Sequence, residues 1–167
     1  YPSEGNASPR LGRLPKSQSL MVNKGFRNPG VEKLVKKIAG QDFEIPIGIS
    51  LGVTNNPEIK TIEQAQEDLI SAFKIIQSGN LKHAYYELNI SCPNLKTKVS
   101  LYDPVPLKQI LAAVEKLKLT KPLFIKMPID RTDVEFKAML KVIAIFPVTG
   151  VIIGNLQKNR KDPALDQ

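Results

Sequence analysis

Features that cross-link or target a protein are scarce in this sequence. Its 167 residues include a single cysteine, which cannot form a disulfide within the chain and suits a reducing compartment or a protein that needs no cross-link. No apolar run approaches the roughly 18 residues of a membrane-spanning helix. The charged segment followed by an apolar region that marks a secretory signal is also missing. We therefore expect no disulfide framework, spanning helix or signal peptide among these residues.

The composition is that of an ordinary folded domain. Hydrophobic residues make up 42% and charged residues 24% of the chain, values that argue against wholesale disorder, and the length is enough for one domain with a core. The formal net charge of +8 raises the question of nucleic-acid binding. However, lysines such as Lys33, Lys37, Lys108 and Lys116 are scattered over the expected helix faces. We expect a solvated basic surface and no nucleic-acid partner; weak attraction to anionic lipid headgroups is the alternative.

Helix and strand signals alternate along the chain. Helices are expected to begin at Asn28 with Pro29 in the first turn, at Thr61 with a capping box to Gln64, at Asp103, and at Thr132 with a second capping box to Glu135. Short apolar segments that end in polar turns predict strands between these helices. The expected strands cover residues 45–51, 85–91, 122–128 and 150–155.

This alternation predicts an α/β protein with parallel strands. An open doubly wound sheet and a closed barrel share the pattern, but no glycine fingerprint of the dinucleotide-binding type follows a strand, which favours the barrel. A complete (β/α)8 barrel needs about 250 residues, so we predict a partial TIM barrel of about four parallel strands. Residues 1–167 are expected to form a single domain, with an extended connection over 1–20, β/α units over 28–155 and a tail over 158–167.

Polar residues lie within or directly after three of the predicted strands. Asn89, Cys92 and Asn94 close the strand 85–91, Lys126 lies within the apolar strand 122–128, and Asn155 ends the last strand. In parallel α/β folds the carboxyl ends of the strands carry the active site. Two structural alternatives stay open: Cys92 as a buried thiol beside turn-forming asparagines, and Lys126 in an ion pair with Glu87 of the neighbouring strand.

The segments Asn89–Asn94, Leu123–Lys126 and Gly150–Asn155 closely resemble the dihydroorotate dehydrogenases, FMN-dependent barrel enzymes of pyrimidine (UMP) biosynthesis. The resemblance runs over nearly the whole chain. The segment from Gly5 to Asn28 resembles the quinone-dependent, membrane-associated class, which usually has serine as its base, whereas Cys92 is similar to the base of the soluble classes. The resemblance implies that the chain supplies roughly strands three to six of the barrel.

The resemblance also implies roles for individual residues. Cys92 would be the general base that removes the C5 proton of dihydroorotate while hydride leaves C6 for FMN, and Lys126 would lie by the pyrimidine edge of the flavin. No metal is implied. The remaining residues implied in substrate binding are Gly25, Phe26, Asn89, Asn94 and Asn155, and those implied in cofactor binding, beside Lys126, are Ser50, Asn89 and Gly154.

Several positions depart from the family pattern. Ser50 stands in place of a flavin-contacting asparagine, and Gly154 and Leu156 replace two threonines. Val22 takes the place of a substrate-binding asparagine, with Asn23 next to it.

As partners the resemblance implies dihydroorotate and orotate, with a quinone as electron acceptor, and it allows a homo-oligomer. It implies a location in the cytoplasm or, peripherally, on the cytoplasmic side of the membrane through upstream helices. Two alternatives stay open: a related FMN barrel acting on another pyrimidine, as in dihydropyrimidine dehydrogenase, and a truncated barrel without catalysis.

Overall fold

From residue 31 onward, helices and strands alternate along the chain. The computed structural model describes residues 1–92, 96, 99–154 and 156. Four strands separated by three helices follow an initial helix, as predicted. In chain order the elements are β1 (Leu11–Leu14), β2 (Ser19–Val22), α1 (Val31–Ile38), β3 (Gly48–Leu51), α2 (Ile62–Ser78), β4 (Tyr85–Asn89), α3 (Pro104–Glu115), β5 (Leu123–Met127), α4 (Asp133–Ile143) and β6 (Gly150–Ile153).

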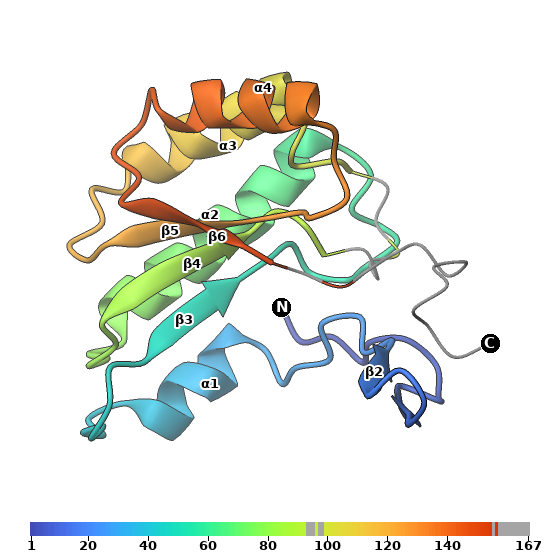
Figure 1. Cartoon of the computed structure of the whole chain (residues 1–167). Coiled ribbons are helices and arrows are strands. Elements are labelled where there is room, and N and C mark those ends of the chain that lie inside the picture. Colours follow the sequence, from blue (N-terminus) through green and yellow to red (C-terminus); the bar gives the residue numbers. More distant parts are fainter. Residues whose placement is uncertain (93–95, 97–98, 155, 157–167) are drawn as a thin grey trace.

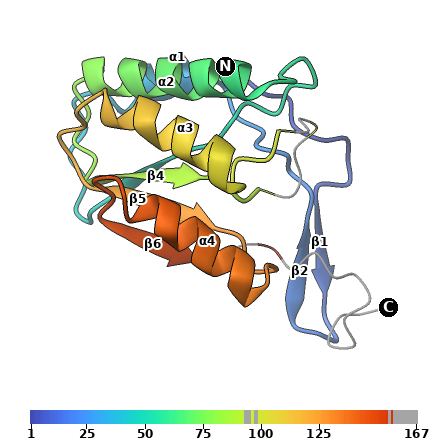
Figure 2. The ribbon, with the colours of Figure 1, turned by 90° about the horizontal axis from the view of Figure 1, so that it is seen from above.

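Strands β3 to β6 form one parallel sheet in sequence order (Figure 1). The register places Leu51 beside Leu88, Leu88 beside Ile125, and Ile125 beside Val151. Since side chains alternate between the faces of a strand, this row and its apolar neighbours all point to one face. Helices α2, α3 and α4 cover that face (Figures 1 and 2), and the core lies between them and the sheet.

The helices begin where local signals are strong. Thr61 and Gln64 form the predicted capping box at the start of α2, and Thr132 and Glu135 form the second one at α4. Asp103 occupies the N-cap position of α3 with Pro104 in the first turn, but its side chain makes no capping hydrogen bond. The local capping signals therefore predicted the starts of these three helices correctly.

The start predicted for the first helix is wrong. Helix α1 begins at Val31 with Gly30 as its N-cap, at φ 92°, and not at Asn28. The Asn28 side chain accepts a hydrogen bond from the Gly30 N–H at 2.8 Å. The backbone of Asn28 exchanges two hydrogen bonds of 3.0 Å with Ser3, which keeps it extended and delays the helix. Strand β3 likewise begins three residues later than predicted, because Pro46 has no N–H to donate to a ladder.

The N-terminal part holds a β-hairpin that the sequence did not predict. Strands β1 and β2 pair antiparallel, with Leu11 opposite Val22 and Leu14 opposite Ser19. The hairpin lies beyond the carboxyl ends of β4 to β6 (Figure 2). Its turn contains Gln18 at φ 47°. Glycine or asparagine is the usual signal for that conformation, so no residue of this turn indicates a hairpin.

The architecture is that of a partial (β/α)8 barrel, as predicted. One face of the parallel sheet is covered by helices, and the other face carries no helix among the described residues. In a closed barrel this second face would point to the interior. Of the described helices none is long and apolar enough to cross a bilayer.

Candidate active site

A row of polar side chains crosses the face of the sheet that the helices leave open. Ser50 on β3 lies beside Glu87 on β4, and Asn89 on β4 lies beside Lys126 on β5. Glu87 and Asn89 are two residues apart on one strand, so all four side chains point to the same face. Three of the four were singled out from the sequence, and the register brings them together toward the carboxyl ends of the strands.

Asn89 ends β4 and shapes the turn that follows. Its side chain is buried, at 7% relative exposure, and its Oδ1 accepts hydrogen bonds from the Ser91 N–H at 3.2 Å and the Ser91 hydroxyl at 3.3 Å. This local bond pattern competes with the strand ladder and stops it. The amide NH2 of Asn89 is the group left to donate to a ligand. Cys92 follows at intermediate exposure, so the alternative of a fully buried thiol is wrong.

Lys126 does not form the ion pair that was considered for it. Within the described residues no ion pair involves Lys126. The Glu87 carboxylate instead accepts a hydrogen bond of 2.8 Å from the Ser50 hydroxyl. The register explains this, because Phe124 lies directly beside Glu87, whereas Lys126 lies beside Asn89. The Lys126 ammonium is thus a half-buried cation on the open face.

Gly25 and Phe26 approach the carboxyl end of β3. Both have a left-handed backbone, at φ 59° and φ 53°, which is rare for a phenylalanine and concentrates at functional sites. The Phe26 ring packs over Gly52, where an added Cβ would lie 2.4 Å from the ring. Glycine at position 52 therefore lets the Phe26 ring reach the sheet.

Three further residues were predicted for the site: Gly154, Asn94 and Asn155. Gly154 directly follows β6, and a Cβ added there would meet no atom within 4 Å. Asn94 and Asn155 lie outside the described residues. The structure therefore brings together Ser50, Asn89 and Lys126 on adjacent strands, with Cys92 after β4 and Phe26 at the end of β3.

Asn55 is a further polar residue at this end of the sheet, which the sequence did not single out. Its side chain is buried at 8% exposure. The Asn55 amide donates to the Gly25 carbonyl at 2.9 Å and to Asn6 Oδ1 at 3.1 Å, and its Oδ1 accepts from the Lys96 N–H at 2.5 Å. These partners lie 30, 49 and 41 residues away in sequence. No local pattern could have revealed them.

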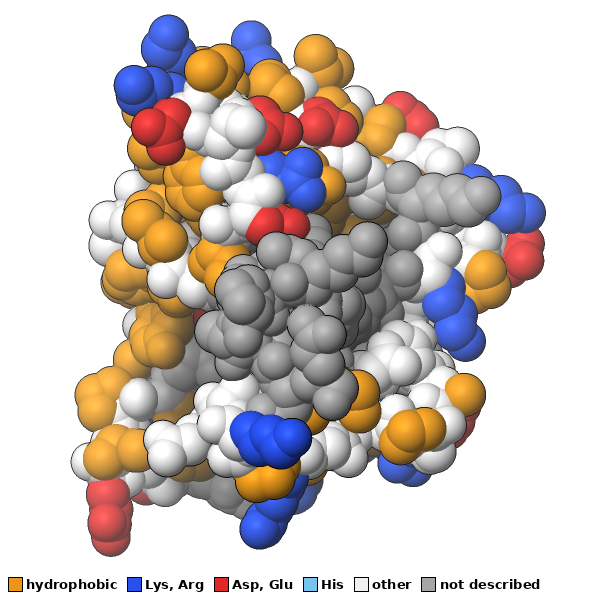
Figure 3. All heavy atoms as spheres, turned by 45° about the vertical axis from the view of Figure 1, so that its right-hand side comes forward, with side chains coloured by type: hydrophobic (Ala, Val, Ile, Leu, Met, Phe, Trp, Pro, Cys, Tyr) orange, Lys and Arg blue, Asp and Glu red, His pale blue; other side chains and the backbone are white. Residues whose placement is uncertain are grey.

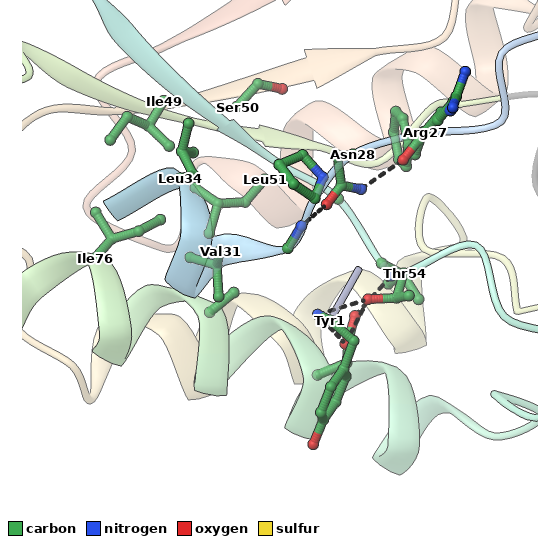
Figure 4. Close-up of a pocket in the computed structure, with 17 residues that line it drawn as sticks. Tyr1, Arg27, Asn28, Val31, Leu34, Ile49, Ser50, Leu51, Thr54 and Ile76 are labelled. Atoms are coloured by element: carbon green, nitrogen blue, oxygen red, sulfur yellow. Dashed lines mark hydrogen bonds and ion pairs between the residues drawn. The ribbon is translucent and has the colours of Figure 1, made fainter. Parts of the chain in front are cut away.

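A cavity of about 340 Å3 lies beside this site, along the outer edge of β3 (Figure 4). Val31 and Leu34 of α1 and Ile76 of α2 line it with Ile49 and Leu51 of β3. Its lining is largely apolar, and it shares only Ser50 and Phe26 with the predicted site. It lies at the edge of β3 that no other described strand pairs with, between α1 and α2, whereas Asn89 and Lys126 lie on the open face of the sheet.

Basic side chains are distributed widely. Figure 3 shows Lys and Arg at separate places around the visible face. Arg131 follows β5 and lies over the Tyr102 ring, 4.7 Å from its centroid. Burial acts to lower the pKa of Arg131, but Tyr102, Asp130 and Glu135 outweigh it, so the pKa is raised above the ordinary value. Arg131 is therefore a fixed positive charge at this end of the sheet.

The fold and the polar row define a segment of a (β/α)8 barrel whose candidate site lies at the carboxyl ends of its strands. The sequence model of the family described as dihydroorotate dehydrogenase matches residues 1–166. The chain belongs to the dihydroorotate dehydrogenase family.

Individual relatives agree with this assignment. The chain is 32% identical over 171 residues to a dihydroorotate dehydrogenase (quinone) of Chloroflexus aurantiacus, covering 96% of this chain and 46% of the relative. It is 32% identical to that of Trichormus variabilis, covering 90% and 39%. The chain thus spans less than half the length of these curated relatives.

Solved structures agree in fold. The chain superposes on DHODH from Eimeria tenella in complex with ferulenol with a TM-score of 0.77 at 23% identity, and on the ligand-free form with a TM-score of 0.80 at 22% identity. These matches cover 98% of this chain and 49% and 51% of the two solved chains.

Proposed function

We propose that the protein to which this chain contributes oxidises dihydroorotate to orotate in pyrimidine biosynthesis, with FMN as cofactor and a quinone as electron acceptor. The observation that carries the proposal is the family membership of a chain whose Asn89 and Lys126 lie side by side at the carboxyl end of the sheet. The curated relatives that match are quinone enzymes by name. This supports a quinone as acceptor despite the cysteine at position 92.

Cys92 is assigned the role of the base that takes the C5 proton. A thiol has an ordinary pKa near 8.5, so its thiolate is accessible close to neutral pH and can accept a proton from carbon. Its position three residues after the end of β4 and its partial exposure are compatible with contact to a substrate. The substrate would be held beside Cys92 by the side-chain amides of Asn89, Asn94 and Asn155, because an amide can pair with both a carboxylate and a ring N–H. Gly25 and Phe26 are also assigned to substrate binding.

The residues on the open face fit a flavin. When bound, FMN accepts the hydride that leaves C6 of the substrate. Lys126 offers a cation that is unpaired within the described residues, which suits the acceptor-rich pyrimidine edge of a flavin. Asn89 offers an amide donor beside it. Ser50 and Gly154 are assigned to the same cofactor. The Ser50 hydroxyl donates to Glu87, so its oxygen would accept from the ligand.

The proposal includes a place for the protein in the cell. A quinone acceptor is a membrane lipid, so the enzyme would work at the cytoplasmic face of the membrane as a peripheral protein.

The test uses the full-length protein. The purified protein should be yellow, and it should reduce a dye or a soluble quinone when dihydroorotate is added. Cys92→Ala should lower kcat at least about 100-fold, the usual range for loss of a positioned general base. Cys92→Ser should retain part of the activity, with its optimum at higher pH because a hydroxyl ionises less readily than a thiol.

Two results would contradict the proposal. A Cys92→Ala protein with the wild-type rate would remove Cys92 from the role of base. Turnover of dihydrouracil without turnover of dihydroorotate would assign the protein to a different pyrimidine. Flavin absorbance of the variant serves as the control, since loss of FMN would lower activity for another reason.

A further inference from the structure

Three asparagines connect segments that are far apart in sequence. Asn55 donates to the Gly25 carbonyl and to Asn6 Oδ1, and Asn6 in turn donates to Asn23 Oδ1 at 2.8 Å. The Lys96 N–H donates to Asn55 Oδ1. We call Asn6, Asn23 and Asn55, with these backbone partners, the asparagine junction. It joins the hairpin region, the β3–α2 loop and the backbone of Lys96.

The chemistry of position 55 requires a carboxamide. Its nitrogen faces two acceptors and its oxygen faces one donor, and asparagine is the short side chain that supplies both. At 8% exposure the partners have little access to water. Removing one member of a buried hydrogen-bonded set leaves the others unsatisfied, which costs more than the bond itself contributes.

The backbone directly before Asn55 is held by hydrogen bonds to helix α2. The preceding residue, Thr54, donates its backbone N–H and its hydroxyl to the two carboxylate oxygens of Asp68, each at 2.7 Å. Asp68 is buried in helix α2. The loop that carries Asn55 is thereby tied to the middle of a long core helix, so its amide is a rigid support for the segments it holds.

The segment held most directly is the turn at Gly25 and Phe26. A Cβ at Gly25 would lie 2.6 Å from both the Asn55 amide nitrogen and the Asn6 side chain, so the junction packs tightly against this backbone. Glycine adopts a left-handed backbone at little cost, but Phe26 at φ 53° does not, and such a residue persists only when its surroundings hold it. The bond from Asn55 to the Gly25 carbonyl is part of what holds this turn.

We propose that Asn55 is a positioning residue of the substrate site. It fixes the Gly25–Phe26 turn against the carboxyl end of β3 and ties the backbone at Lys96, four residues after Cys92, to the same point. The inference rests on the proposed function, because Gly25, Phe26 and Cys92 are assigned to substrate there. Asn55 itself acts through these groups.

The test compares neighbouring asparagines in the full-length protein. Asn55→Ala should raise the KM for dihydroorotate by about tenfold or more while the FMN content stays unchanged, since the cost of unpaired buried partners falls on the substrate turn. Asn56→Ala is the matched control. Asn56 is exposed, and its side chain accepts a local hydrogen bond from the Glu58 N–H at 3.0 Å, so the KM of Asn56→Ala should equal that of the wild type.

Asn55→Asp gives a readout that a purely structural role would not move. The carboxylate keeps an acceptor for Lys96 but cannot donate to Gly25 or Asn6. Protonation restores one donor. The loss of kcat/KM relative to the wild type should therefore shrink as the pH falls, a dependence that Asn55→Ala lacks. This variant also keeps the side-chain volume if Asn55→Ala folds poorly.

Hydrogen exchange separates the inference from the proposed function. Amides of residues 23–26 should exchange faster in Asn55→Ala than in Asn56→Ala, whether or not dihydroorotate is the substrate. A wild-type protein inactive with dihydroorotate would refute the proposed function and leave this measurement intact. Unchanged exchange at residues 23–26, or an unchanged KM in a protein that turns over dihydroorotate, would overturn the role of Asn55.

Discussion

His83 lies at the amino-terminal end of the sheet, away from the candidate site. Its ring is buried, at 4% exposure, and meets Tyr86 edge-on with centroids 4.5 Å apart. Lys121 Nζ is 3.5 Å from His83 Nδ1 and also donates to the carbonyls of Leu81 and His83. An ammonium can only donate, so Nδ1 is the acceptor and Nε2 carries the hydrogen. Burial, and then the Lys121 charge, lower the pKa of His83 below its ordinary value.

This arrangement predicts a loss of stability in mild acid. Because the unfolded chain binds a proton more readily than the folded one, the free energy of unfolding falls as the pH drops below the ordinary histidine value of about 6.5. His83→Phe keeps an aromatic ring against Tyr86 and cannot titrate. Urea unfolding of the full-length wild type and variant between about pH 7.5 and about pH 5.5 checks this: the difference should move in favour of the variant as the pH falls.

Lys121→Met provides a second comparison. It leaves two carbonyls without their donor and should lower stability at every pH, but it also removes the charge that opposes protonation of His83. Its pH dependence should therefore be weaker than that of the wild type. A wild-type slope retained in His83→Phe would show that another group is responsible.

At the scale of elements, the start of helix α2 is set by a local signal that the sequence contains. Its capping box is formed by the Gln64 N–H donating to the Thr61 hydroxyl at 3.3 Å and the Thr61 N–H donating to Gln64 Oε1 at 3.2 Å. Thr61→Ala should lower the free energy of unfolding by about 1 kcal/mol, the typical cost of losing a cap. Thr61→Ser keeps the hydroxyl and is the control. Thermal or urea unfolding of both variants measures the difference, and equal losses would contradict a capping role.

Features that depend on neighbours in sequence could be predicted, whereas features that depend on distant residues could not. The capping boxes at Thr61 and Thr132 involve neighbours three residues apart, and both were found. Asn28 has an equally good local signal, but its backbone pairs with Ser3, 25 residues away, and the helix starts later. The β1–β2 hairpin was missed because its turn lacks the usual glycine or asparagine.

In the candidate site, too, residue types at strand ends could be predicted, but their distant partners could not. Strand ends mark Asn89, Cys92 and Lys126, and the parallel register then brings Asn89 and Lys126 together. The ion pair between Lys126 and Glu87 is not formed, because the register places Phe124 beside Glu87, and the Ser50 hydroxyl donates to the carboxylate instead. Asn55 has partners that only the folded chain brings near. Residue type at a strand end was therefore predictable, whereas partner choice required three dimensions.

At the scale of the whole chain, the described residues form a parallel sheet with helices on one face. Among the described residues β3 pairs only with β4, and β6 only with β5. The helices bury one face in a continuous core, while the relatives are more than twice as long as this chain, as the coverage of 46% and 39% indicates. In a closed barrel of eight strands both edges would be paired.

Residues 1–167 expressed alone are therefore expected to self-associate. Unpaired edges present rows of N–H and C=O groups that add further strands, and a charged side chain on an edge strand opposes this. Ile153 is 67% exposed on edge strand β6, so Ile153→Lys should shift the distribution toward monomer in size-exclusion chromatography with light scattering. Val134→Lys is the matched control, because Val134 is 78% exposed on helix α4, away from either edge. Circular dichroism confirms that both variants keep their helices.

Equal shifts in the two variants would assign the association to exposed apolar side chains in general. A monomeric wild-type chain would show that these strand edges do not pair with another copy.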